Sequence, residues 1–151
     1  MKRVKKTPIE VLRFFLELQS MDVDSGDVIT DLKAQKLLYY AQGMSLAKLN
    51  EPLFNDDFVA WQHGPVIPEL YNELKKFGSQ QIELKEDLEI KKFSNKEQEL
   101  LISVYKTFGQ YSAWKLRDMT HDEAPWKSVN IGETITKESI RAFFSERYAR
   151  L

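Results

Sequence analysis

The two histidines of the sequence, His63 and His121, are the first residues to consider for chemistry. Three carboxylates, Asp118, Asp122 and Glu123, lie around His121 at near-helical spacing. Imidazole nitrogens and carboxylate oxygens bind divalent metals and exchange protons, so a small metal-dependent hydrolase using His63, His121 and Asp118 is one hypothesis. Solvated helix ends carry similar clusters. We therefore predict no catalytic residue, no metal and no cofactor, and a hydrogen-bonded structural or interface role for His63.

Other enzyme signatures are absent from the sequence. There is no G-x-S-x-G elbow, no phosphate-binding loop, no dinucleotide fingerprint and no H-E-x-x-H helix. The chain has no cysteine, which excludes disulfides, thiolate metal sites and cysteine nucleophiles, and favours a reducing compartment. We predict a cytoplasmic protein that is not an enzyme.

The charge balance bears on nucleic-acid binding. The chain has 22 Lys+Arg and 23 Asp+Glu, which argues against a protein that coats nucleic acid through its net charge. Lys33 and Lys36 lie in the first turns of a predicted helix, where the dipole disfavours cations by about 0.3–1 kcal/mol each. They are either solvated or face an acidic partner surface or a phosphate. Four further cations lie near the N-terminus: Lys2, Arg3, Lys5 and Lys6. They could extend a basic patch, but such a run is typical of a frayed, solvated tail, and we predict no nucleic-acid partner.

The stretch AWQHGPVIPELY, residues 60–71, predicts a rigid corner. Gly64 and Ile67 each precede a proline, which disfavours the α conformation for both. The chain should therefore stay extended or turn through Pro65, and a helix should begin at Pro68.

Four large aromatic residues could be core or interface: Trp61, Tyr71, Trp114 and Trp126. Burial in the core is the commoner outcome for such residues, because it contributes strongly to folding. Trp and Tyr are also the usual anchors of protein interfaces. Trp61, beside the rigid corner, is therefore a candidate interface anchor.

The elements that position these residues are mostly helices. Capping and periodicity predict six, over residues 7–20, 30–50, 68–77, 94–108, 112–119 and 136–148. Two of them begin with capping boxes, Thr7 with Glu10 and Ser94 with Glu97. The helix over 30–50 is apolar on most of its surface and should be central, and Gly43 within it predicts close packing against another helix.

The fold class follows from this pattern. We predict a mainly α, compact single-domain bundle of about five to six helices, spanning residues 1–151, with short strand or hairpin elements near 58–62 and 82–90 and a polar loop over 20–27. No segment approaches the roughly 18 apolar residues that would span a bilayer, and Glu10 and Glu17 interrupt the apolar run that follows the basic N-terminus. We expect no signal peptide and no membrane partner.

Residues 30–78 resemble the SocA-like Panacea domain, which is found in antitoxins of bacterial and phage toxin–antitoxin systems. The matching pieces are KAQKLLYY (33–40), PLF (52–54) and AWQHGPVIPELY (60–71). YSAWKLRDMTHDEAPW (111–126) resembles the second characteristic block of that family, and ITKESIRAFF (135–144) its closing helix. The resemblance thus covers nearly the whole chain in order.

This resemblance implies a binding protein. Members neutralise a toxin, usually encoded next to them, by direct contact; one is similar yet delivers its toxin to a bacterial protease, and others occur in phage-associated proteins. The motif and candidate partner-binding residues are Lys33, Lys36, Tyr40, Trp61, His63, Gly64, Pro65, Val66, Pro68, Tyr71 and Trp126. They either contact the toxin or form the scaffold that holds the contact surface.

Overall fold

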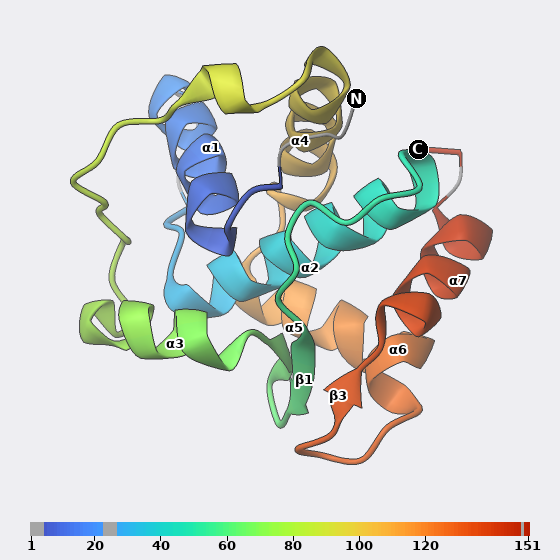
Figure 1. Cartoon of the computed structure of the whole chain (residues 1–151). Helices are drawn as coiled ribbons and strands as arrows, with labels where there is room; N and C mark the ends of the chain where they lie inside the picture. Colours follow the sequence, from blue (N-terminus) through green and yellow to red (C-terminus); the bar gives the residue numbers. More distant parts are fainter. Residues whose placement is uncertain (1–4, 23–26, 149) are drawn as a thin grey trace.

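The computed structural model describes residues 5–22, 27–148 and 150–151 (Figure 1). The predicted tail residues Lys2 and Arg3, and residues 23–26 of the predicted polar loop, lie outside this range. The elements in chain order are α1 Pro8–Met21, α2 Asp31–Lys48, β1 Phe58–Trp61, β2 Gly64–Val66, α3 Pro68–Leu74, α4 Asn95–Phe108, α5 Ala113–His121, α6 Ala124–Lys127, β3 Thr134–Ile135 and α7 Lys137–Arg147. The predicted mainly α fold is confirmed.

Local sequence signals position the helix starts. Both predicted capping boxes form, with the Thr7 hydroxyl accepting from the Glu10 amide and the Ser94 hydroxyl from the Glu97 amide. Helix α3 begins at Pro68, as the two X-Pro steps predict. The helix that sequence periodicity missed is α6, a single turn that begins at Ala124 with Pro125 in its first positions.

Helix α2 is the centre of the molecule, with α1, α4, α5 and α7 arranged around it (Figure 1). Its residues are buried on all sides from Lys33 to Leu46, as the apolar surface of the predicted helix indicated. Gly43 faces α7, where a Cβ atom would lie 2.4 Å from the ring of Phe144. Close helix packing therefore explains this glycine. None of the described helices is long and apolar enough to cross a membrane.

We expect the substitution Gly43→Ala to lower the free energy of unfolding by about 2–3 kcal/mol, because the added methyl overpacks the buried contact with Phe144. Urea denaturation of the purified variant measures this. Ser145→Ala, an exposed change on α7, is the control and should leave the free energy of unfolding unchanged. Gly78→Ala would not serve, because Gly78 has a φ of 58°, a backbone conformation in which alanine is strained. Equal midpoints for Gly43→Ala and the wild type would show that Phe144 can move aside.

The strands form a small antiparallel sheet in the order β2-β1-β3. Val59 pairs with Val66 and Trp61 with Gly64, so β1 and β2 make a tight hairpin around Gln62 and His63. Strand β1 confirms the element predicted near residues 58–62.

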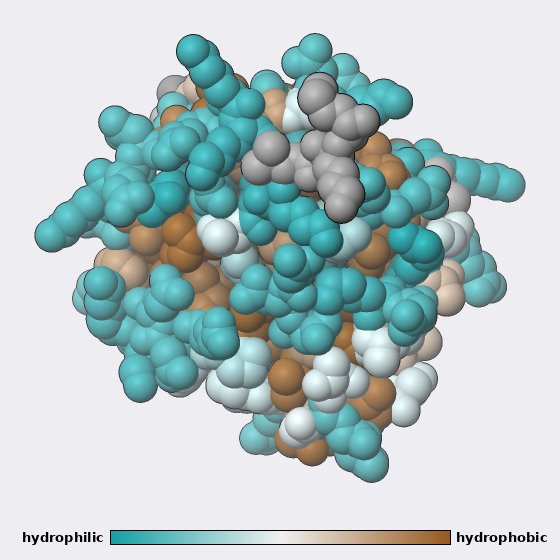
Figure 2. Space-filling view, viewed as in Figure 1, coloured by the Kyte–Doolittle hydropathy of each residue, from teal (hydrophilic) through white to brown (hydrophobic). Residues whose placement is uncertain are grey.

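The second strand-like element, near residues 82–90, was a wrong prediction. The chain between α3 and α4 runs as an irregular connection there, with a 3-10 turn at Ile90–Lys92. Within the part of the chain that the structure describes, it bonds to the backbone of another segment through the Ile82 amide, which donates to the Ile29 carbonyl. A strand needs a neighbouring edge to pair with, and none lies beside this connection in the described chain. In the view of Figure 2, which is that of Figure 1, apolar residues are visible at the surface between α1 and α3.

Candidate functional site

A cleft of about 660 Å³ opens beside the predicted corner. The first turns of α2, the β1–β2 hairpin and α3 form its walls. Trp114 of α5 and the loop residues Ile131 and Gly132 complete its rim. Five of the predicted residues line it, Lys36, Trp61, His63, Val66 and Tyr71, so the fold brings part of the predicted site together. Asp31, which was not predicted, lines it too.

Helix α2 holds the corner from behind. The Lys36 Nζ donates a hydrogen bond to the Pro65 carbonyl at 3.1 Å. The Gln35 side chain accepts from the Ile67 amide at 2.9 Å. Gly64 has a φ of 110°, and a Cβ there would lie 2.6 Å from the Lys36 Cε. Glycine is therefore required at this position both by backbone conformation and by the close approach of the lysine stem.

The prediction for Lys36 was wrong: its side chain is completely buried, neither solvated nor facing a partner. Burial lowers the pKa of Lys36 to about 7, nearby Arg117 acts in the same direction, and Asp31 opposes both. Burial raises the pKa of Asp31, while Gln35 and Lys36 act to lower it. The neighbours of Asp31 and Lys36 thus offset only part of the cost of removing these two charged groups from water.

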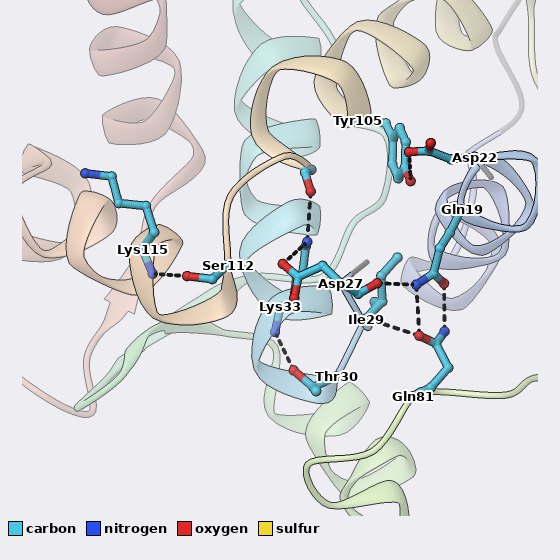
Figure 3. A network of polar contacts seen from close by, with 11 residues as sticks. Gln19, Asp22, Asp27, Ile29, Thr30, Lys33, Gln81, Tyr105, Ser112 and Lys115 are labelled. Carbon is cyan, nitrogen blue, oxygen red and sulfur yellow. Dashed lines mark hydrogen bonds and ion pairs between the residues drawn. The ribbon is translucent and has the colours of Figure 1, made fainter. Parts of the chain in front are cut away.

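Lys33 was also predicted wrongly, since it too is buried. Its Nζ donates to the Gly109 carbonyl at 2.8 Å and lies 3.2 Å from the Asp27 carboxylate (Figure 3). Gly109 follows α4, where the helix dipole favours a cation. Lys33 thus links α2 to the end of α4.

Among the described residues, the N-terminal cations form neither the frayed tail that was expected nor the alternative basic patch. Lys6 is buried and pairs with the Glu97 carboxylate at 2.6 Å, so this part of the chain is not a frayed tail. Lys5 is exposed and donates to the Asn55 side chain. Of the cations named for nucleic-acid binding, the described ones either are buried or lie apart, so they do not form a joint basic surface.

Of the four aromatic residues, some support the hairpin from inside and others are exposed at the edge of the cleft. Trp126 is partly buried, and its Nε1 donates to the Trp61 carbonyl at 2.8 Å, so it supports the hairpin. Trp61 is partly buried and meets Tyr71 edge-to-face at 5.1 Å. Trp114 is 58% exposed and Tyr71 37% exposed, so these two do not follow the commoner outcome of burial in the core.

Arg117 organises the other side of the rim. Its guanidinium lies 5.1 Å from the ring centre of Trp114. Its Nε donates to the His63 Nδ1 at 3.1 Å, which confirms that His63 is hydrogen-bonded. His121 stacks instead on Trp126 at 4.1 Å, and Asp118 pairs with Arg117. Within the described ranges, no three histidine, aspartate or glutamate side chains gather as a metal-binding group, so the ligand set of the hydrolase hypothesis is not assembled.

The sequence pattern of one family, described as antitoxin SocA-like, Panacea domain, matches residues 34–127. The chain belongs to this family. It is also 33% identical over 115 residues to the antitoxin SocA of Caulobacter vibrioides, an alignment that covers 69% of this chain. The chain spans 61% of the length of that relative. No solved structure matches the chain.

The matched part of this Panacea domain runs from α2 to α6 and includes the hairpin and most of the cleft. Its motif residue Tyr40 lies in the interior and not at the cleft. The hydroxyls of Tyr39, Tyr40 and Tyr148 donate to the Glu123 carboxylate at 3.1, 3.0 and 2.5 Å. Burial raises the pKa of Glu123, and the three hydrogen bonds counteract it. The second block of the Panacea motif thus supplies the acceptor for tyrosines on α2 and beyond α7.

Among the residues that sequence reasoning missed as site residues are Asp31 and Gln35, which line the Panacea cleft, and Arg117, which contacts His63 and Trp114 beside it. Gln35 carried a usable signal, because a polar side chain within a helix that is apolar all round must find a partner. The signal does not say which partner. The bond from Arg117 to His63 joins residues 54 positions apart, and no local pattern indicates it.

Proposed function

We propose that this chain is an antitoxin that neutralises a protein toxin by direct contact, and that the rim of the cleft is the contact surface. Membership of the SocA-like family carries the proposal, because the family is described as antitoxin-like and the matched relative is named an antitoxin. The toxin is expected to be encoded beside this gene. No step of this role needs catalysis by the chain.

The composition of the rim supports the surface chosen. Trp114, Tyr71 and Arg117 are the residue types that most often dominate the energy of protein interfaces. The Pro65–Pro68 corner, held by Gln35 and Lys36, is rigid and loses little entropy on binding. Residues behind the corner, such as Lys36 and Trp126, are scaffold in this proposal, and Trp114 is contact.

Co-expression tests the proposal. Each neighbouring reading frame is induced alone and then together with this chain, in wild-type hosts and in hosts that lack the main energy-dependent proteases. We expect one neighbour to arrest growth alone and to be rescued as a copurifying complex in both hosts. Rescue that fails in the protease-deficient host would assign neutralisation to proteolytic delivery. If no neighbour is toxic and none copurifies, the proposal is wrong.

The substitution Trp114→Ala separates contact from scaffold. We expect it to weaken toxin binding by roughly 30-fold or more, as for an interface anchor, and to change stability by no more than about 0.5 kcal/mol because the indole is largely exposed. Calorimetric titration and thermal melting measure the two quantities.

Ile90→Ala is the matched control, an exposed apolar truncation on the connection before α4. It should leave both quantities unchanged. Binding by Trp114→Ala at the affinity of the wild type would move the contact surface away from this rim.

A further inference from the structure

The cleft contains one buried carboxylate, that of Asp31, which has few interactions with the rest of the described chain. Asp31, in the first turn of α2, lines the cleft and is only 7% exposed. Its Oδ1 accepts a long hydrogen bond, 3.4 Å, from the Gln35 Nε2. Lys36, the cation that acts on it, directs its Nζ to the Pro65 carbonyl instead. Among the residues that the structure describes, Asp31 has no ion-pair partner and its Oδ2 accepts no hydrogen bond. The desolvated carboxylate therefore retains capacity to bind a cation.

The walls beside Asp31 are aromatic. Trp61 and Tyr71 meet edge-to-face and both line the cleft, with Val66 next to them. Aromatic faces attract ammonium and guanidinium groups, and the aliphatic stems of lysine and arginine pack well on apolar surface. A carboxylate behind aromatic walls thus matches both parts of a basic side chain.

The other charges at the cleft are cations, and each is accounted for. Lys36 is completely buried behind Gly64 and Pro65, so it offers little to an incoming acidic group. Arg117 is engaged by Asp118, His63 and Trp114. Lys75 also lines the cleft, and because it is exposed its charge is solvated. The buried charge at the cleft that lacks a close partner is therefore the negative one on Asp31.

We propose that the cleft receives an arginine or lysine side chain of the toxin, with its charged head on Asp31 and its stem packed against the wall that Trp61 and Tyr71 form together. This inference rests on the proposed function and names the chemistry of the partner. The exposed Trp114 and Ile131 at the rim extend the surface beyond the size of a single side chain, which fits a polypeptide rather than a free amine.

The test uses Asp31→Asn, which keeps the shape and the acceptor for Gln35 but removes the charge. With the copurifying toxin as probe, we expect Asp31→Asn to weaken binding by roughly 10- to 100-fold, the range for loss of a charge-assisted hydrogen bond. The variant should keep the melting temperature of the wild type, since it removes a desolvated charge. Asp87→Asn, an exposed change on the connection before α4, is the control and should bind as the wild type does.

A double-mutant cycle then identifies the partner group. Each surface arginine and lysine of the toxin is changed to glutamine, and one of these variants should lose as much affinity as Asp31→Asn, with no further loss when the two are combined. Should Asp31→Asn fold poorly, Tyr71→Leu replaces it in the test, because Tyr71 is the exposed residue of the aromatic wall. We expect this variant to lose affinity for the toxin by about 5-fold or more.

The outcomes separate this inference from the proposed function. A wild-type chain that binds no neighbouring protein overturns the proposed function. If the wild-type chain binds its toxin but Asp31→Asn binds it equally well, only the inference that a basic side chain of the toxin occupies the cleft is overturned. The same holds if the losses for Asp31→Asn and for every toxin cation variant are additive.

Discussion

Replacing Glu123 by alanine is expected to lower the free energy of unfolding by about 4 kcal/mol, a large fraction of the 5–15 kcal/mol typical of a domain. The carboxylate accepts hydrogen bonds from Tyr39, Tyr40 and Tyr148 in or near the core. Alanine leaves these hydroxyls without their acceptor and opens a cavity, and both effects destabilise. Urea denaturation gives the difference from the midpoint and the slope.

Two neighbouring substitutions control for this change. Asp122→Ala removes an exposed carboxylate at the end of α5 and should change stability by no more than about 0.5 kcal/mol. Glu123→Gln retains one oxygen acceptor and should fall between Glu123→Ala and the wild type. If Glu123→Ala unfolds at nearly the same urea concentration as the wild type, the tyrosine hydroxyls find other partners.

The stability of the protein should rise with pH above neutrality because of Lys36. The folded lysine loses its proton above about 7, whereas the unfolded one remains charged up to its ordinary pKa near 10.5. In this window the unfolded chain binds more protons, so increasing pH favours the folded state. Since one pKa unit corresponds to about 1.4 kcal/mol, the contribution of this buried group reaches on the order of 5 kcal/mol across the window.

Comparison with Lys36→Met isolates that contribution, because methionine fills the space of the stem and does not titrate. We expect the difference in unfolding free energy between wild type and Lys36→Met to grow in favour of the wild type from pH 7 to pH 10, measured by urea denaturation at each pH. Lys115→Met, at an exposed lysine, should follow the wild type throughout. Parallel curves for wild type and Lys36→Met would show that the lysine stays charged in the folded protein.

Predictions from the sequence succeeded where the cause is local. A capping box needs residues three positions apart, and both boxes form. The extended path up to Pro68 follows from steric clashes between neighbouring residues, and the structure confirms it. The close packing predicted from Gly43 needed one further fact, that the helix is apolar all round and must therefore be covered on every face.

Predictions failed where distant segments decide. Lys33 and Lys36 look like surface residues by type, but a carbonyl at the end of α4 and another in the hairpin give each a buried partner. The stretch near 82–90 has strand-like composition and no edge to pair with. The cleft itself depends on how α5 places Trp114 opposite the hairpin, which no local pattern specifies.

The family pattern matches residues 34–127, yet the interior continues beyond that match. Helix α7, beyond that limit, supplies Phe144 to the rings of Tyr39 and Tyr40 and to the groove at Gly43. A polypeptide ended at residue 127 would leave one side of the central helix bare. The matched segment is thus shorter than the packed interior, and any transplant of this domain into a chimera has to carry α7 with it.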